Sequence, residues 1–309
     1  MLHYIIRRLL WMPIVLIAVS FITFALGYYG PGDPIQVLMG QHADPEVLAR
    51  IRHERGLDRP FLIQYLDYLW RTAHGDFGES YMFRGQPVGG LIMNKVWVSA
   101  QLGIVATIIG VATGIPLGLI AALRQGTWMD TTIVGLTLLW LSIPVFVTAP
   151  ILLFVFAFKL HLLPTYGWGG MLDVRIIMPA FVLGLGPVAG LTRLMRASTL
   201  DVIGQDYIRT ARAKGLLERV VVGRHIARNA LLPILTVLGL SLATLVEGAF
   251  ITETFFGIPG IGRLAVDSLF ARDYPIIMAM TLLVAVAYVL ANLLVDVGYT
   301  FLDPRIRYR

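Results

Sequence analysis

The sequence predicts an all-α, polytopic membrane protein with six transmembrane helices. Charged residues make up 14% of the 309 residues, against about 25% in typical soluble domains. Hydrophobic residues reach 57%, and the mean hydropathy is +0.75. Six apolar runs approach or exceed the about 20 residues that a helix needs to cross a bilayer. This composition excludes most soluble folds, disorder and a coiled coil.

The six spans follow from these runs, because backbone groups in hydrocarbon must hydrogen-bond within the segment. We place them at residues 9–28, 96–123, 131–158, 176–197, 229–253 and 274–298 of one transmembrane domain, residues 1–309. The fourth run is extended through Arg193, whose side chain can snorkel, and the fifth past Glu247 to Glu253. Arg7 and Arg8 before the first run also resemble a signal peptide. That run is too long and lacks a good cleavage site before Gly30, so it is kept as a span.

The basic residues predict the orientation. With the N-terminus inside, fourteen Lys and Arg residues fall on the inner segments and four on the short outer loops. Both termini are therefore expected in the cytoplasm, since basic residues accumulate on cytoplasmic loops. The net charge of +6 has the same origin, and we do not interpret it as a nucleic-acid signal.

The outer segment at residues 29–95 is expected to form a small helical cap. Asp44 and Pro45 are typical of an N-cap and a first helical residue, and Gly56 ends that helix. Pro60 begins a second helix with an apolar face, which ends near Gly75. That face is expected to pack on the membrane helices, on the membrane interface or on an external partner. A shorter outer loop is expected at residues 254–273.

The inner segment at residues 198–228 contains a short helix, expected at residues 207–214. Asp206 is predicted to cap its start, and Gly215 to supply a left-handed stop after Arg212 and Lys214. A two-turn helix is marginal alone. Ala211 and Ala213 would let a groove on another protein approach its backbone. The alternative is a basic amphipathic element lying on anionic lipid.

The sequence lacks the usual catalytic motifs, so we do not expect an enzyme. No Gly-Lys-Ser or Gly-Lys-Thr triplet is present, which excludes a P-loop. Cysteine is absent, and the six histidines show no metal-ligand spacing. Glycines four residues apart should let helices pack closely; they are Gly110, Gly114 and Gly118, and Gly186 and Gly190.

A transport pathway needs polar side chains within the spans, and few are present. Glu247 and Asp296 lie toward the two ends of their spans, which favours structural pairing or interfacial exposure over a proton path. We name Ser142, Thr148 and Glu247 as pathway candidates. A self-sufficient secondary carrier or channel is the rival function, and a membrane enzyme is a third.

Short motifs follow one another along nearly the whole chain. They are Pro31-Gly32-Asp33-Pro34, Gly56-Leu57-Asp58, Gly75-Asp76-Phe77-Gly78, residues 206–215, Arg228-Asn229-Ala230, Pro259-Gly260-Ile261-Gly262, Arg272-Asp273-Tyr274-Pro275 and Asp303-Pro304-Arg305. Together they resemble the first membrane permease of ATP-binding-cassette importers of the dipeptide, oligopeptide, nickel and glutathione group. Where the wider importer pattern has Glu-Ala-Ala, this chain has Arg209-Thr210-Ala211.

The resemblance implies a type I importer permease fold in the inner membrane of a prokaryote. It implies three kinds of partner besides the bilayer: a second homologous permease, two ATPase subunits that bind ATP and magnesium, and an extracytoplasmic binding protein. The chain itself would carry no cofactor and no metal. The ATPase-coupling residues would be Asp206, Tyr207, Arg209, Thr210, Ala211, Arg212, Ala213, Lys214 and Gly215.

Overall fold

The computed structural model describes residues 2–30, 44–54 and 56–302. This part of the chain consists of helices joined by turns and loops, with an isolated bridge between Glu79 and Pro87. The helices on the N-terminal side are α1 (Leu2–Tyr29), α3 (Pro45–Glu54), α4 (Phe61–Ala73), α5 (Val88–Leu123), α6 (Trp128–Ser142), α7 (Val145–Leu152) and η1 (Leu153–Lys159). They are followed by η2 (Val174–Ile176), α8 (Ile177–Ile203), α9 (Asp206–Ala213), α10 (Glu218–Val220), η3 (Val221–Ala227), α11 (Arg228–Ala230), α12 (Leu232–Glu247), α13 (Phe250–Phe256), α14 (Ile261–Ala271) and α15 (Tyr274–Leu302).

Four of these described helices are long and apolar enough to cross a membrane by themselves: α1, α5, η2 with α8, and α15. Two bent pairs raise the number to six if each pair counts as one span. The motifs at residues 31–34 and 303–305 lie outside the described residues.

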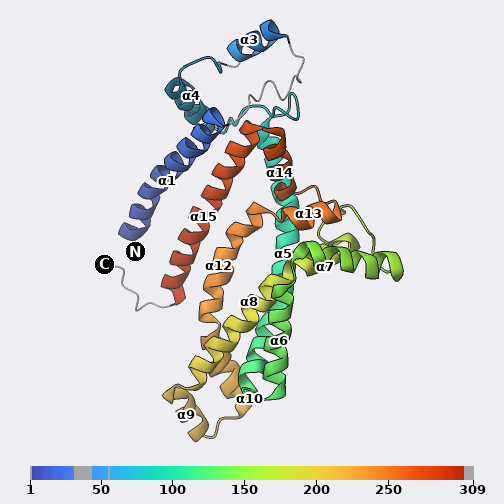
Figure 1. Cartoon of the computed structure of the whole chain (residues 1–309). Coiled ribbons are helices and arrows are strands. Elements are labelled where there is room, and N and C mark those ends of the chain that lie inside the picture. Colours follow the sequence, from blue (N-terminus) through green and yellow to red (C-terminus); the bar gives the residue numbers. More distant parts are fainter. Residues whose placement is uncertain (1, 31–43, 55, 303–309) are drawn as a thin grey trace.

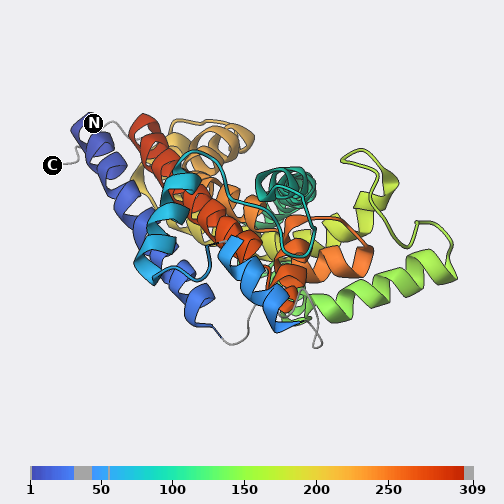
Figure 2. The ribbon, with the colours of Figure 1, turned by 90° about the horizontal axis from the view of Figure 1, so that it is seen from above.

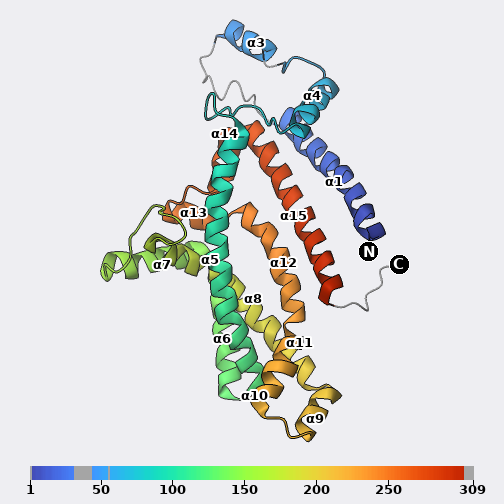
Figure 3. The ribbon, with the colours of Figure 1, turned by 180° about the vertical axis from the view of Figure 1, so that it is seen from behind.

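The expected third span is not one straight helix. Its two parts, α6 and the α7–η1 segment, meet at an angle of 98°. Ile143 between them is extended (φ −90°, ψ 116°), and Pro144 precedes the second part. Proline disfavours a helical residue before it and donates no hydrogen bond, which explains the break. The α7–η1 segment consequently projects sideways (Figures 1 and 3).

The fifth span, expected at residues 229–253, ends earlier than predicted. Helix α12 stops at Glu247, and residues Phe250–Phe256 form the separate helix α13. Gly248 between them has φ +80°, and a Cβ atom there would lie 2.5 Å from the backbone nitrogen of Gly262. Both the left-handed conformation and the close approach require glycine.

Helices α5 and α8 pack along each other at the centre of the molecule. A Cβ atom on Gly110 would come within 2.6 Å of Pro187, and one on Gly114 within 2.8 Å of the Val188 carbonyl oxygen. The glycine stripe of α5 therefore makes this close approach possible, as predicted. Gly186 and Gly190 meet no atom within 4 Å, so that part of the prediction is wrong. Seen from above, α1 and α7 lie on opposite sides of this pair (Figure 2).

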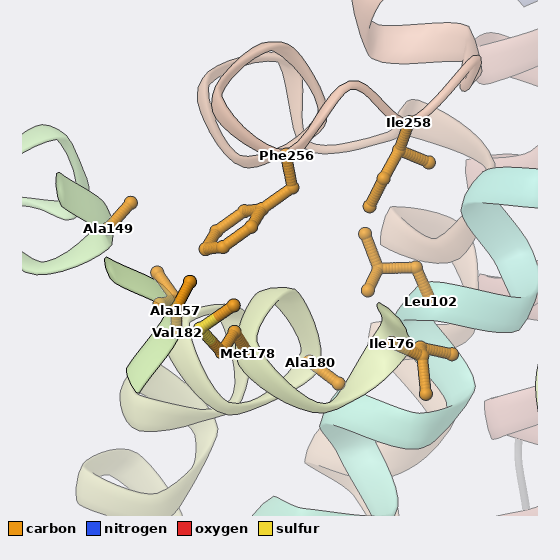
Figure 4. Close-up of a cluster of buried hydrophobic side chains, with 9 residues drawn as sticks. All are labelled: Leu102, Ala149, Ala157, Ile176, Met178, Ala180, Val182, Phe256 and Ile258. Carbon is orange, nitrogen blue, oxygen red and sulfur yellow. The ribbon is translucent and has the colours of Figure 1, made fainter. Parts of the chain in front are cut away.

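The largest hydrophobic cluster joins the bent segment to this central pair. It combines Leu102 from α5, residues from α7, η1 and η2, Met178 and Val182 from α8, and Phe256 and Ile258 around the end of α13 (Figure 4). Segments far apart in the sequence thus share one core.

An ion pair fastens α6 to α8. Nε of Arg196 donates to Oδ1 of Asp130 at 2.7 Å, and Nη2 donates to Oδ2 at 2.8 Å. The Gly126 amide also donates to Oδ2 at 3.1 Å. The bidentate geometry holds the loop between α5 and α6 against the C-terminal half of α8.

We expect Asp130→Ala to lower the free energy of unfolding of the purified chain by about 2 kcal/mol, because hydrogen bonds to charged groups are lost. Thermal unfolding in detergent measures this change. Asp201→Ala on the exposed side of α8 is the control and should unfold like the parent chain. Equal stability of both variants would contradict a role for the pair.

The segment between α1 and α5 forms the two expected helices. Oδ1 of Asp44 accepts a hydrogen bond from the Glu46 amide at 3.0 Å, and α3 begins at Pro45, as predicted. Phe61 and Tyr65 of α4 pack against Phe21 and Phe24 of α1. One face of α4 therefore packs on the membrane helices, which was one of the three expected surfaces.

Candidate functional site

Helix α9 lies at one end of the molecule, opposite to α3 and α4 (Figures 1 and 3). It covers residues Asp206–Ala213, one residue earlier than predicted. The N-cap is Gln205, which is extended (φ −76°, ψ 145°) and makes no side-chain cap. Asp206 is therefore not the N-cap. It lies in the first turn, where its carboxylate complements the helix dipole and sits 3.7 Å from Arg209.

The apolar side of α9 faces its own chain. Ile208 and Ala211 are buried against Val221 and Ile226 of η3, with Val202 and Ile203 of α8 beside them. Ala211 is only 6% exposed, so the prediction that a partner approaches it is wrong. Ala213 is exposed and stays available. This anchoring joins α9 to both α8 and the segment that leads into α12.

Gly215 ends α9 in the left-handed conformation that the sequence predicts, with φ +74°. Its amide donates to the Arg212 carbonyl oxygen at 2.9 Å, and the Leu216 amide donates to the Ala211 carbonyl oxygen at 3.4 Å. These two bonds form a Schellman motif, which satisfies carbonyl groups at the helix end. Lys214 is the C-cap residue rather than part of the helix.

An ion pair closes the loop after α9. The Arg212 guanidinium donates to both carboxylate oxygens of Glu218, at 2.7 and 3.2 Å. The hydrogen bonds that Arg212 donates to this carboxylate, together with the carboxylate's charge, raise the pKa of Arg212. The pair sets the direction in which the chain leaves α9 toward η3.

The opposite side of α9 and the following loop form one exposed surface, which we call the α9 surface. It carries positive charge together with three large hydrophobic side chains, Tyr207, Leu216 and Leu217. Its exposed members are Asp206, Tyr207, Arg209, Thr210, Arg212, Ala213, Lys214, Gly215, Leu216, Leu217, Glu218 and Arg219. The surface is mainly basic, has an apolar component and has an ordered backbone. These features are typical of a surface that docks in a groove of another protein, and less so of a catalytic site.

The three pathway candidates are not brought together by any described contact. Ser142 and Thr148 lie on either side of the break between α6 and α7, and each hydroxyl bonds to a carbonyl of its own helix turn. Glu247 is the last residue of α12, and its side chain lies outside the described part of the structure. Their role in a pathway stays a prediction. Among the described residues, no three His, Asp or Glu side chains gather as a metal ion would require.

A buried carboxylate that sequence reasoning missed organises the opposite half of the molecule. Glu253 in α13 is 0% exposed. Its Oε1 accepts hydrogen bonds from Ser99 Oγ at 2.6 Å and from the Ala249 amide at 3.0 Å, and its Oε2 accepts from the Arg263 amide at 2.8 Å. The Ser99 hydroxyl in turn accepts from the Ile261 amide at 2.8 Å. The only sequence signal was a carboxylate inside an apolar run.

A second buried carboxylate, Asp273, explains the Arg272-Asp273-Tyr274-Pro275 motif. Asp273 precedes α15 and accepts hydrogen bonds from the Ser80 hydroxyl at 2.5 Å and the Met82 amide at 2.8 Å. Its other oxygen accepts from the Ile276 amide in the first turn of α15 at 3.4 Å. It therefore ties the segment before α5 to the start of α15.

Two family models match the chain. The model described as "Binding-protein-dependent transport system inner membrane component" matches residues 114–308, and the model of its N-terminal part matches residues 1–95. The dipeptide transport system permease protein DppB of Escherichia coli (strain K12) is 39% identical, with 100% of both chains covered. The oligopeptide transport system permease protein OppB of the same strain is 40% identical, also with 100% of both chains covered.

A solved structure also resembles this fold. A chain of the inward-facing MetNI methionine ABC transporter superposes with a TM-score of 0.51 at 17% identity, covering 67% of this chain and 95% of that chain. At this identity the likeness concerns the fold alone. The two chains therefore share a similar helical arrangement.

Proposed function

The chain belongs to the family of binding-protein-dependent transport system inner membrane components, and from this premise we propose how it works within a peptide importer. It is a multi-pass inner-membrane permease subunit, not an ATPase, and it acts with other components of an ABC importer. We propose that it forms half of a translocation pathway whose other half is a second, homologous permease. Two ATPase subunits supply ATP and magnesium, and an extracytoplasmic binding protein delivers the substrate.

The α9 surface is the proposed contact with an ATPase subunit. The observation that carries this proposal is the anchoring of α9 by Ile208 on η3 and α8. Because α9 is held by both the fourth and the fifth span, a force on it reaches α8 and α12 together. Closure of the ATPase pair on ATP would thus bias an equilibrium between inward-open and outward-open states.

Peptides, or a related small solute, are the proposed substrate. The names of the two relatives, a dipeptide and an oligopeptide transport permease, support this class. The binding protein would set most of the selectivity, and Ser142, Thr148 and Glu247 would act only as weak contacts along the route.

Six spans with both termini in the cytoplasm remain our proposal for the topology. Helices α1 and α15 run antiparallel, so the start of α1 and the end of α15 lie on the same side (Figures 1 and 3). An antiparallel first and last helix fits an even number of crossings, so the two bent pairs must either both be spans or both not be spans. The proposal takes both as spans. The basic residues around α9 support a cytoplasmic position for that end.

Cysteine protection tests the docking of α9, because the parent chain contains no cysteine. A membrane-impermeant maleimide should react quickly with Ala213→Cys in the chain alone and several-fold more slowly in the assembled importer. Ala211→Cys is the matched control, since it replaces the same residue type at a buried position, and it should react slowly in both.

The same assay separates protein docking from lipid contact. Equal reactivity of Ala213→Cys with and without the ATPase subunits would contradict the proposal. Protection of the chain alone in anionic liposomes would favour the lipid alternative. Uptake that depends on an ion gradient and not on ATP would instead identify a secondary carrier.

A further inference from the structure

Helix α4 presents three different faces around its axis. At about 100° per residue, side chains three or four positions apart lie on one face. The face against α1 carries Phe61, Tyr65 and Tyr68; the second carries Leu62, Leu66 and Trp70; the third carries Gln64, Asp67 and Arg71. An amphipathic helix at the edge of a soluble domain needs only two faces, one apolar and one polar.

The first face packs against α1, with Tyr65 buried at its centre. The ring centroid of Tyr65 lies 5.3 Å from that of Phe21 and 5.6 Å from that of Phe24. Its hydroxyl shares a hydrogen bond with the Ser20 hydroxyl at 3.0 Å and donates to the Ile17 carbonyl oxygen at 3.2 Å. Since Ile17 and Ser20 lie inside the first apolar helix, α4 is held directly against a membrane-crossing segment.

The second face is apolar and uncovered. Leu66 is 61% exposed and Trp70 is 69% exposed, and Leu62 and Ile63 beside them are exposed as well. The third face is polar: Arg71 and Asp67 form an exposed ion pair at 3.1 Å. A helix that meets protein on one face, apolar surroundings on the next and water on the third fits the boundary between bilayer and solvent.

The apolar face of α4 continues into the surface of α1. Phe21 contacts both Phe61 and Tyr65 and is still 43% exposed, so it connects the two helices. Exposed Ile22 and Leu26 extend the apolar surface along α1. Exposed Tyr29 and Trp70 supply the aromatic rings with polar tips that favour the headgroup region.

We infer that α4 is an interfacial helix whose Leu62–Leu66–Trp70 face inserts into the lipid beside the first span, at the level where headgroups meet acyl chains. The helix fixes the depth and tilt of the outer end of α1 through the Tyr65 contacts. The occupant is phospholipid rather than a partner protein. This inference concerns a lipid contact and does not depend on which solute the importer carries.

Nitroxide accessibility tests the inference. The full chain is labelled at Leu66→Cys or at Asp67→Cys and placed in nanodiscs of phosphatidylethanolamine and phosphatidylglycerol. These neighbouring residues face different sides of α4, so they form a matched pair. The ratio of collisions with apolar oxygen to collisions with a water-soluble nickel chelate should be several-fold higher at residue 66. Leu62→Cys should resemble residue 66, and Arg71→Cys should resemble residue 67.

Two results would overturn the inference. Equal ratios at residues 66 and 67 would mean that both positions have the same surroundings, so that the Leu62–Leu66–Trp70 face is not inserted selectively into lipid. An immobile label at residue 66, protected from both reagents, would mean that protein covers this face. If Leu66→Cys fails to insert, the pair Leu62→Cys and Arg71→Cys decides by the same ratio.

Discussion

Replacing Gly215 by valine is expected to abolish most ATP-driven uptake while the assembled importer still hydrolyses ATP. A Cβ atom on Gly215 would meet no atom within 4 Å, so the obstacle is the backbone and not space. With φ at +74°, a β-branched residue is strained by at least about 1–2 kcal/mol. The strain is relieved by giving up the Schellman bonds to Arg212 and Ala211, which reorients the end of α9.

Gly215→Asn is the matched control, because asparagine tolerates the left-handed conformation that valine does not. It adds a side chain of comparable size to the same open position and should keep most of the uptake. Uptake and ATP hydrolysis are measured on proteoliposomes with equal amounts of inserted permease. Normal uptake by the valine variant would show that the geometry of this helix end does not matter for coupling.

Helix α9 is held in place by contacts at its end, on its buried side and in the loop that follows. A two-turn helix is marginal by itself, yet this one is fixed on three sides: at its end by Gly215, beneath by Ile208, and along the following loop by the Arg212–Glu218 pair. A contact surface that transmits force must not unfold when it is pushed. Under the proposed coupling, this anchoring is what would allow so small an element to move two spans.

Much of the fold could be predicted from local signals. Apolar runs located the long helices, and Pro45, Pro60 and Gly215 marked helix ends because their backbone preferences act within a few residues. The glycine stripe of α5 predicted a close approach, although not its partner helix. Pro144 explains locally why the helix breaks, but the 98° bend also depends on where the hydrophobic cluster around Phe256 holds α7.

Contacts between distant segments left no comparable signal. Ser99 and Glu253 are 154 residues apart in the sequence, so nothing nearby indicated that they would meet. The same holds for Ser80 and Asp273, which are separated by 193 residues. At the α9 surface, the motif predicted the helix and its glycine stop. It did not reveal that Ala211 faces inward, because this depends on the position of η3.

Replacing Glu253 by alanine is expected to destabilise the chain more than any other single carboxylate change that we describe. Three donors would lose their acceptor: the buried Ser99 hydroxyl and the half-buried Ala249 and Arg263 amides. Since each unsatisfied buried group costs about 1–3 kcal/mol, we expect a loss of about 4 kcal/mol in the free energy of unfolding. Gly260 packs directly against the carboxylate. Because glycine has no side chain, it cannot fill the cavity that the alanine substitution would leave.

Thermal unfolding of the purified chain in detergent measures the effect. Glu253→Gln should be intermediate, because its amide oxygen can still accept from Ser99 and Ala249 while its amide nitrogen faces the Arg263 donor. Asp267→Asn is the control from the same region, since its ion pair with Arg263 is exposed and spans 3.6 Å, and exposed pairs contribute about 0–1 kcal/mol. If Glu253→Ala unfolded at the same temperature as Asp267→Asn, the Glu253 carboxylate would not be what holds α13 and α14 on α5. A Glu253→Ala variant that kept its stability but lost uptake would instead show that Glu253 acts in the transport cycle and not in stabilising the fold.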